Sequence, residues 1–513
     1  MYRDGALKSI WQSEINLTGN TAFTGQLYDV AIAGAGITGL SCAIALQERG
    51  MRCIVLEAEN AGFGTTGGTT AHLNTFFDAT YEQVIRDFGL PEARLLATCG
   101  KEAIAFIREH ISRYQIDCAF EDKTAYLFAL DEKQERHLKD IAAAANEVGV
   151  IMQACDKIPF PIPFLAAVAI PDQAQFHPIQ YIQGLRAAFI QAGGAFVEQC
   201  RVADYEQKDD KLHIATRQGT VHAWHLIYAT HTPPGINLIH FRNVPWRSYA
   251  LAVKLEDAAY PQALGYDLND PYYYYRSQQV DGEWYLIAGG QDHKTGSHTD
   301  TEECLEQLSI QVRKHFRVKE IVRAWSSQFF EPADGLPYIG RIPGGPDNVF
   351  VATGYNGNGM IFGTASARVL SDLIVNGHSP YEELFNPRRI KPVAGFSTFV
   401  SHNASVVASF IKDKLYVKHI EGLAKLAPGE GRVVEFEGTT YAIYKDEGGK
   451  VHALHNSCTH AKCTVHWNNA EKTWDCPCHG SRFGIKGNVL NAPAVRDLER
   501  VPLHKNIDDG LIL

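Results

Sequence analysis

A glycine-rich turn between two apolar segments most narrows the folds open to this 513-residue chain. Residues 28–33 predict a buried strand that leads into Gly34, Gly36 and Gly39, and a helical pattern and a second apolar strand follow. Glycines at this spacing permit a tight turn and let a pyrophosphate approach the N-terminus of the helix. Glu57, at the end of the second strand, can bind ribose hydroxyls. We therefore expect a Rossmann-type dinucleotide site, with Thr38 beside the turn.

A cysteine and histidine pattern near the other end of the chain predicts a metal centre. Cys458-x-His460 and Cys476-x-x-His479 supply two thiolates and two imidazoles, the set in which two histidines replace two thiolates on one iron of a Rieske [2Fe–2S] cluster. A zinc site is the alternative, because tetrahedral zinc accepts the same donors. Zinc sites usually have CxxC pairs at both ends, so the spacing favours the iron–sulfur cluster.

Around these ligands the sequence resembles the Rieske proteins of the cytochrome bc type. The resemblance implies a disulfide between Cys463 and Cys478 that ties the two cluster loops, although a cytosolic disulfide would be an exception. Ser481 falls where those proteins have a hydroxyl group that raises the reduction potential. Phe483 falls where they have a tyrosine whose hydroxyl also raises the potential, so this second donor is absent. We therefore expect a potential within about −150 to +300 mV, below that of the quinol-oxidising type.

Two later segments indicate that the dinucleotide is FAD. Residues 219–233 contain an apolar strand that ends at Ala229 and Thr230, resembling the second nucleotide-contact strand of flavoproteins. Residues 334–360 lead through a strand into a turn before the next helix. Glycines at such a turn let backbone N–H groups reach the anionic edge of a flavin. The further cofactor-binding candidates are Val202, Gly354, Asn358, Gly359 and Met360.

Residues 28 to about 378 resemble the D-amino acid oxidase/glycine oxidase superfamily, and the whole chain resembles bacterial fusions of such an enzyme with a Rieske domain. The resemblance implies bound FAD and hydride transfer from a carbon that bears an amine or a similar donor. The loop 64–72 resembles the flavin-pyrophosphate loop of the family, which implies that Thr70 and His72 contact the cofactor. In some relatives a histidine of this loop is bonded covalently to the flavin, and a hydrogen bond from His72 is the alternative.

The sequence departs from this family at the substrate carboxylate. Glycine oxidase-like members place arginines at the positions of Phe329 and Gly357. A bidentate arginine clamp is hard to replace, so a simple α-amino acid substrate is disfavoured. The remaining catalytic candidates come from the tyrosine run 272–275, from the arginine that closes this run and from the polar stretch 289–294: Tyr275, Arg276, His293 and Lys294. The tyrosines of the run either line the pocket or belong partly to the core.

These landmarks predict an α/β Rossmann-type FAD domain of the glutathione reductase/D-amino acid oxidase kind, an α+β substrate domain and a C-terminal all-β Rieske domain. The expected order is an N-terminal extension (1–27), the oxidoreductase (28–378), a linker and helix (379–414, with the helix at 394–412) and the Rieske domain (415–513). The FAD-binding parts span about 28–80, 170–235 and 330–378, and the substrate-domain parts span about 81–169 and 236–329. Amphipathic patterns predict helices at 102–114 and 132–147.

Charge and composition limit the partners. The net charge of −10 and the lack of a basic run argue against nucleic acid and anionic membrane surfaces. The first 27 residues lack the apolar core of a secretory signal, and no apolar run reaches the roughly 20 residues that span a bilayer. Four of the eleven cysteines lie between 458 and 478, which is typical of a metal site and not of a secreted disulfide framework. We expect a cytoplasmic protein without a membrane span.

Electron counting completes the prediction. Oxidation of an amine delivers two electrons as a hydride, whereas a Rieske cluster accepts one at a time. We therefore expect electrons to pass singly from FAD to the cluster and, through an exposed edge formed by His460 and His479, to an outside acceptor. This favours a dehydrogenase over an oxidase. The alternatives are a reductase with the reverse flow and a redox-sensing or docking flavoprotein; a Rieske oxygenase is disfavoured because the chain has no DxxHxxxxH run for mononuclear iron.

Overall fold

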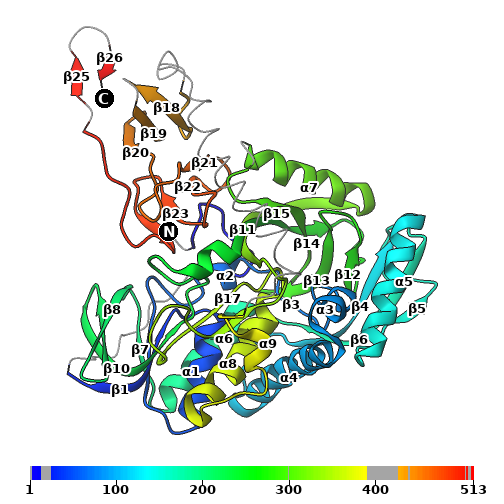
Figure 1. Ribbon diagram of the computed structural model, residues 1–513. Helices are drawn as coiled ribbons and strands as arrows, with labels where there is room; N and C mark the ends of the chain where they lie inside the picture. Colours follow the sequence, from blue (N-terminus) through cyan, green and yellow to red (C-terminus); the bar gives the residue numbers. More distant parts are fainter. Residues whose placement is uncertain are drawn as a thin grey trace.

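The computed structural model describes residues 3–12, 25–297, 300–389, 426–436, 439–502, 504–506 and 510–512. The helix predicted at 394–412 lies outside these residues. Figure 1 shows two sheet-containing layers in the larger part of the chain and a smaller part of short strands at the C-terminal end, which lies next to α7 (Thr301–His315).

The first sheet contains the predicted Rossmann unit. β1 (Leu27–Ala33) pairs in parallel with β2 (Cys53–Leu56) and β10 (Gly219–Tyr228), and the strand order is β16-β17-β10-β1-β2-β7 with β9 and β8 added at β10. The last four residues of β1 are buried because one face packs in a core shared with α1 and α8 and the other in a core that includes apolar residues of β8 and β9. The other elements of this layer are α1 (Ile37–Glu48), α2 (Thr65–Gly68), α6 (Pro178–Gln191), β7 (Ala195–Val197), β8 (Val202–Lys208), β9 (Lys211–Thr216), β16 (Tyr338–Arg341), β17 (Val349–Thr353), α8 (Gly359–Asn376) and α9 (Glu382–Phe385).

The second sheet has nine strands and forms the predicted α+β part. Its order is β15-β11-β14-β13-β12-β4-β6-β3, with β5 paired to β6. The predicted helices 102–114 and 132–147 are present as part of α4 (Leu90–Tyr114) and as α5 (Glu132–Glu147). The other elements are β3 (His72–Leu73), α3 (Tyr81–Phe88), β4 (Glu121–Ala129), β5 (Gln153–Cys155), β6 (Ala166–Gln175), the 3₁₀ helix η1 (Leu238–Arg242), β11 (Asn243–Leu255), β12 (Leu264–Asp267), β13 (Tyr274–Val280), β14 (Glu283–Lys294) and β15 (Val318–Pro332).

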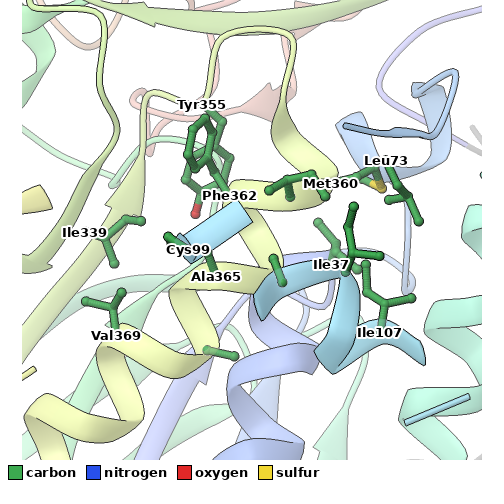
Figure 2. Close-up of a cluster of buried hydrophobic side chains, with 14 of the residues drawn as sticks. Ile37, Leu73, Cys99, Ile107, Ile339, Tyr355, Met360, Phe362, Ala365 and Val369 are labelled. Carbon is green, nitrogen blue, oxygen red and sulfur yellow. The ribbon is translucent and has the colours of Figure 1, made fainter. Parts of the chain in front are cut away.

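The largest hydrophobic core joins the two layers. α8 packs against α1 and α4, and Figure 2 shows Phe362, Ala365 and Val369 of α8 facing Ile37 and Cys99. Each of these five side chains is buried. Apolar residues at helical spacing on one face explain why α8 forms here, and their burial fixes the start of α8 against the Rossmann turn.

The C-terminal part consists of small antiparallel sheets. β18 (Gly431–Phe436), β19 (Thr439–Lys445) and β20 (Val451–His455) form one sheet, and β21 (His466–Asn468), β22 (Thr473–Asp475), β23 (Arg482–Gly484) and β24 (Val489–Asn491) form a second. A third pair joins β25 (His504–Asn506) to β26 (Gly510–Ile512). The predicted combination of a Rossmann-type layer, an α+β layer and an all-β C-terminal part is therefore confirmed.

Candidate active site and metal centre

A cavity opens at the carboxyl ends of β1, β2 and β10, the usual ligand position in an open α/β sheet. The second sheet closes its other side through Ser248, Tyr274 and Phe329. Most of the predicted cofactor-binding residues line it: Gly34, Gly36, Thr38, Glu57, Thr70, Val202, Ala229, Thr230, Gly359 and Met360.

The glycines of the first turn meet a steric need. Gly34 has φ +105°, and a Cβ there would lie 2.5 Å from the carbonyl oxygen of Ala229. A Cβ on Gly36 would lie 2.9 Å from Thr66 Oγ1. Glu57 stands at the cavity wall, where its carboxylate accepts hydrogen bonds from the N–H groups of Ala35 (2.7 Å) and Glu59 (2.9 Å). Burial raises the pKa of Glu57 to about 7 despite these bonds. The turn has the shape and donors that a dinucleotide needs.

Four predicted cofactor residues lie outside the cavity lining. Gly39 packs under the turn, where a Cβ would meet the carbonyl oxygen of Gly34, and Gly354 adopts φ +76° beside Asn243. Asn358 precedes α8 and accepts a hydrogen bond from the N–H of Asp78 (3.0 Å). The Nδ1 atom of His72 is hydrogen-bonded to the Tyr266 hydroxyl at 2.6 Å. These residues shape the site from behind.

The predicted catalytic residues are placed differently from the expectation. Side chains alternate along β13, so Tyr274 reaches the cavity while Tyr275 packs against Phe160 and Phe316 on the other face. The guanidinium of Arg276 is fully buried and donates to the carbonyl oxygens of Thr70 (2.8 Å) and Ala71 (2.7 Å). Arg276 therefore supports the loop 64–72 and does not face a substrate.

His293 and Lys294 also lie outside the lining. His293 is buried behind Tyr249, whose hydroxyl is 2.9 Å from Nε2. Lys294 is half-buried. Burial raises the pKa of Glu331, and the charge of Lys294 partly lowers it again. The positions of Tyr275, Arg276 and His293 do not support direct contact with a substrate.

The cysteine and histidine candidates meet in the C-terminal part. Cys463 and Cys478 form a disulfide, as the resemblance implied. Although the sulfurs of Cys463, Cys476 and Cys478 lie within 4.8 Å of one another, the disulfide leaves Cys476 as the free thiol of that group, and Cys458 is also free. The rings of His460 and His479 are 5.0 Å apart between centroids.

These residues fit a Rieske cluster better than a zinc ion in a CxxC site. Two free thiols and two imidazoles remain after the disulfide is formed, which is the mixed donor set of that cluster. Ser481 Oγ accepts a hydrogen bond from the N–H of Ala494 (3.0 Å), which leaves its own proton for a sulfur. Phe483 is fully buried beside the same loop and has no hydroxyl to donate.

The histidine edge of the metal site packs against the flavoprotein part, in contrast to the expected exposed edge. His240 in η1 lies 4.9 Å from His460 and 6.2 Å from His479 between ring centroids, and Phe241 lies 5.2 Å from His479. His479 is buried. Asn237 donates its N–H to Nδ1 of His240, and Nε2 lies 3.0 Å from the carbonyl oxygen of Pro233, so His240 is a neutral donor with a fixed orientation.

The same docking brings the C-terminal part to the cavity. Leu490, Asn491, Ala492, Ala494 and Val495 line the cavity together with the Rossmann turn. The buried side chain of Gln328, another lining residue, donates a hydrogen bond from Nε2 to the carbonyl oxygen of Gly480 (2.9 Å), next to the candidate ligand His479. One residue thus touches both the cavity and the loop that holds the metal site.

A buried ionic network pins this junction. Arg3 pairs with Glu471 at 2.9 Å, and Arg482 pairs with Asp4 at 2.7 Å and with Asp475 at 3.0 Å. A sixth member, Arg247 of β11, lies 3.5 Å from Asp475. All six side chains are at most 3% exposed, so the predicted N-terminal extension lies partly between the two larger parts.

Sequence reasoning missed the contribution of the junction. Gln328, His231 and the segment 490–495 carry no motif, because their role depends on how two separately folded parts meet. Tyr274 had a usable signal: the period-2 alternation along residues 272–276 separates two faces of a strand.

Comparison with known proteins agrees with this geometry. Residues 29–373 match the family described as FAD dependent oxidoreductase, and residues 416–502 match the Rieske [2Fe-2S] domain. The chain is 33% identical over 477 residues to the Rieske 2Fe-2S iron-sulfur protein YhfW of Bacillus subtilis (strain 168), covering 93% of each chain. It is 25% identical over 373 residues to gamma-glutamylputrescine oxidoreductase of Escherichia coli (strain K12), covering 67% of this chain and 83% of that protein.

Solved structures show the same fold for the larger part. Glycine oxidase from Geobacillus kaustophilus aligns with a TM-score of 0.59 at 20% identity, covering 71% of this chain and 99% of that one. L-proline dehydrogenase from P. horikoshii aligns with a TM-score of 0.59 at 18% identity, covering 71% and 98%. Among the described residues, no helix combines the length and apolar character needed to cross a bilayer. The chain belongs to the FAD dependent oxidoreductase family and is an FAD-dependent oxidoreductase that carries a C-terminal Rieske [2Fe–2S] domain.

Proposed function

We propose that this protein is an amine dehydrogenase in which electrons leave the substrate through FAD, pass singly to the Rieske cluster and then reach an external acceptor. Residues 28–378 would form the oxidising unit and residues 415–513 the electron-carrying unit. The relation to gamma-glutamylputrescine oxidoreductase supports an amine as the substrate class. The observation that carries the proposal is that one cavity is lined by both units.

The proposed cofactor roles follow the cavity lining. Gly34 and Gly36 would leave room for the pyrophosphate, Glu57 would accept a hydrogen bond from a ribose hydroxyl, and the N-terminus of α8 at Gly359 would bind the flavin. A Cβ on Gly359 would meet no atom within 4 Å, so this turn is open on the side where a ligand fits. When bound, FAD accepts a hydride from the substrate carbon, and a Rieske cluster carries one electron at a time.

The metal ligands would be Cys458, His460, Cys476 and His479. His240 and Phe241 pack on their histidine edge, where the ring nitrogens of His460 and His479 are buried. Gln328 holds Gly480 against the cavity wall, which keeps the distance between the two redox sites short and constant. The histidine edge therefore serves the exchange between the two units, and an external acceptor takes electrons from another face of the Rieske domain.

The test is anaerobic mixing of the full-length holoprotein with amines. We expect the flavin absorbance to bleach first and the EPR signal of the reduced cluster to follow, with little peroxide in air. Gln328→Leu should slow the second phase at least tenfold. The matched control is Gln278→Leu, which removes an equally buried glutamine of β13 whose Nε2 donates to the carbonyl oxygen of Ala119, just before β4. A cluster that stays oxidised while the flavin bleaches would refute the relay.

A further inference from the structure

Two carboxylates lie next to the end of the cavity that faces the second sheet, in contact with residues that line it. Asp78 follows the loop after β3, and its Oδ2 accepts a hydrogen bond from the N–H of Gly357 (2.6 Å), a cavity-lining residue. Its Oδ1 accepts from the Tyr272 hydroxyl at 3.0 Å. The side chain of Asp78 is accessible, yet the surrounding protein raises its pKa. This combination is expected for a carboxylate that faces an enclosed space.

A second carboxylate approaches from β14. Asp292 lies beside Ser248 and Tyr274, which line the cavity and are hydrogen-bonded to each other at 2.9 Å. Its Oδ1 atom is buried and makes no hydrogen bond. Burial raises the pKa of Asp292 to about 7 although a hydrogen bond from Ser248 lowers it, and the charge of Asp78 adds a smaller increase. A buried carboxylate oxygen without a donor is costly unless a ligand supplies one.

Positive charge around these carboxylates is scarce. No arginine or lysine among the described residues acts on Asp78 or Asp292, and Lys294 acts on the neighbouring Glu331. Phe329 and Gly357, the positions at which the resemblance to glycine oxidase-like enzymes implies arginines, carry no charge. This end of the cavity therefore has two carboxylates beside it and, among the described residues, no arginine or lysine that acts on them.

Aromatic side chains complete this end of the cavity. Tyr274 and Phe329 line it, Tyr272 stands beside Asp78, and Trp246 stacks with Phe329 at 6.5 Å between ring centroids. Ring faces attract an alkylammonium, and their bodies pack against its methylene groups. Carboxylates and aromatic rings together fit a cationic alkyl amine.

We propose that the substrate is an amine that carries a second positive charge and no carboxylate near the reacting nitrogen, with Asp78 and Asp292 holding that second charge. This inference rests on the proposed function and names its substrate class. The reacting amine would lose a hydride from carbon to FAD and a proton from nitrogen to water, leaving an imine, and the second ammonium would stay bound throughout.

Three compounds of equal chain length test the proposal on the holoprotein: 1,4-diaminobutane, butylamine and 4-aminobutyrate, which end in a cation, a methyl group and an anion. Binding is measured by equilibrium dialysis, and turnover by anaerobic bleaching of the flavin. We expect 1,4-diaminobutane to bind at least tenfold more tightly than butylamine, and 4-aminobutyrate to bind most weakly. Asp292→Asn should remove most of the advantage of the diamine over butylamine.

Two further variants separate a binding role from a structural one. Asp78→Asn should act like Asp292→Asn. Asp267→Asn removes another carboxylate of the same sheet, one that is held by the N–H groups of Asn269 and Tyr273 in its own loop, and it should leave the order of the three compounds unchanged. Retention of the flavin spectrum shows that each variant is folded.

The outcomes distinguish this inference from the proposed function. If 4-aminobutyrate binds as tightly as 1,4-diaminobutane, or if the diamine does not bind, the assignment of a cationic substrate is wrong although amine oxidation can stand. If the diamine binds in an Asp292-dependent manner but no amine bleaches the flavin, the cation site stands and the dehydrogenase proposal fails.

Discussion

Replacing Glu471 with glutamine should release the Rieske domain from the flavoprotein part. Glu471 is fully buried, pairs with Arg3 and also accepts hydrogen bonds from the N–H (2.9 Å) and the hydroxyl (2.7 Å) of Ser326 on β15. Glutamine keeps the shape but leaves three buried arginines facing two carboxylates. Breaking a buried ion pair on one side costs about 3–5 kcal/mol, which corresponds to about a 100- to 4,000-fold loss in the docking equilibrium.

The neighbouring Lys472 supplies a matched control. Its ammonium lies 3.6 Å from Glu302, and the two side chains are 34% and 59% exposed, so Lys472→Gln should cost less than about 1 kcal/mol. Both variants are compared by urea denaturation, with the flavin and the cluster followed separately by their visible absorbance and circular dichroism. Glu471→Gln should lower the midpoint of the cluster signal by on the order of 1 M urea or more. Equal midpoints for the two variants would refute the role of the network.

Three other predictions concern pH, potential and the flavin linkage. Burial favours the neutral forms of Asp4, Glu471 and Asp475, but the neighbouring arginines outweigh burial and lower the pKa values of all three. The network therefore stabilises docking fully above about pH 4, and this stabilisation is lost as the pH falls through the lowered pKa values. Small-angle scattering measures docking, and docking that stays constant down to pH 2 would contradict this. Phe483→Tyr should raise the cluster potential by on the order of 40 mV, since one hydrogen bond contributes about 1 kcal/mol and a one-electron couple shifts 59 mV per tenfold change; redox titration measures it. Acid precipitation should release the flavin into the supernatant, because His72 lies outside the cavity lining and is hydrogen-bonded to Tyr266; colour retained in the pellet would show a covalent link.

The cofactor sites could be predicted because their chemistry is local in sequence. The turn from Gly34 to Gly39 and the two cysteine and histidine pairs each lie within a few residues, so one strand-to-helix turn or one loop sets the geometry. The disulfide between Cys463 and Cys478 followed from resemblance to a family with the same two loops. Short motifs of this kind fix a backbone shape, and the surrounding fold then has few ways to differ.

The substrate side could not be predicted from the same reasoning. Tyr275, Arg276 and His293 were candidates because they belong to or close the tyrosine run 272–275 or lie in the polar stretch 289–294. The sheet directs Tyr275 to the opposite face and Arg276 to the carbonyl oxygens of residues 70 and 71. Asp78 and Asp292 lie 214 positions apart in the sequence, and only the tertiary fold brings Asp78 close enough to act on the pKa of Asp292. The residues of such a site depend on side-chain direction and on contacts between distant segments, and a local sequence motif predicts neither.

The shared cavity has a thermodynamic consequence that goes beyond electron transfer. Residues of the Rossmann turn and the segment 490–495 line the same space, so a ligand that fills this space contacts both parts of the protein at once. Binding to the docked state is therefore favoured over binding to an undocked one, and by linkage the ligand strengthens docking by the same factor. Loss of the flavin and weakening of the buried network at Arg3 and Glu471 should therefore both shift the same equilibrium, from the docked to the undocked Rieske domain. The docked state, in which the two redox sites are adjacent, is therefore most stable when FAD is bound.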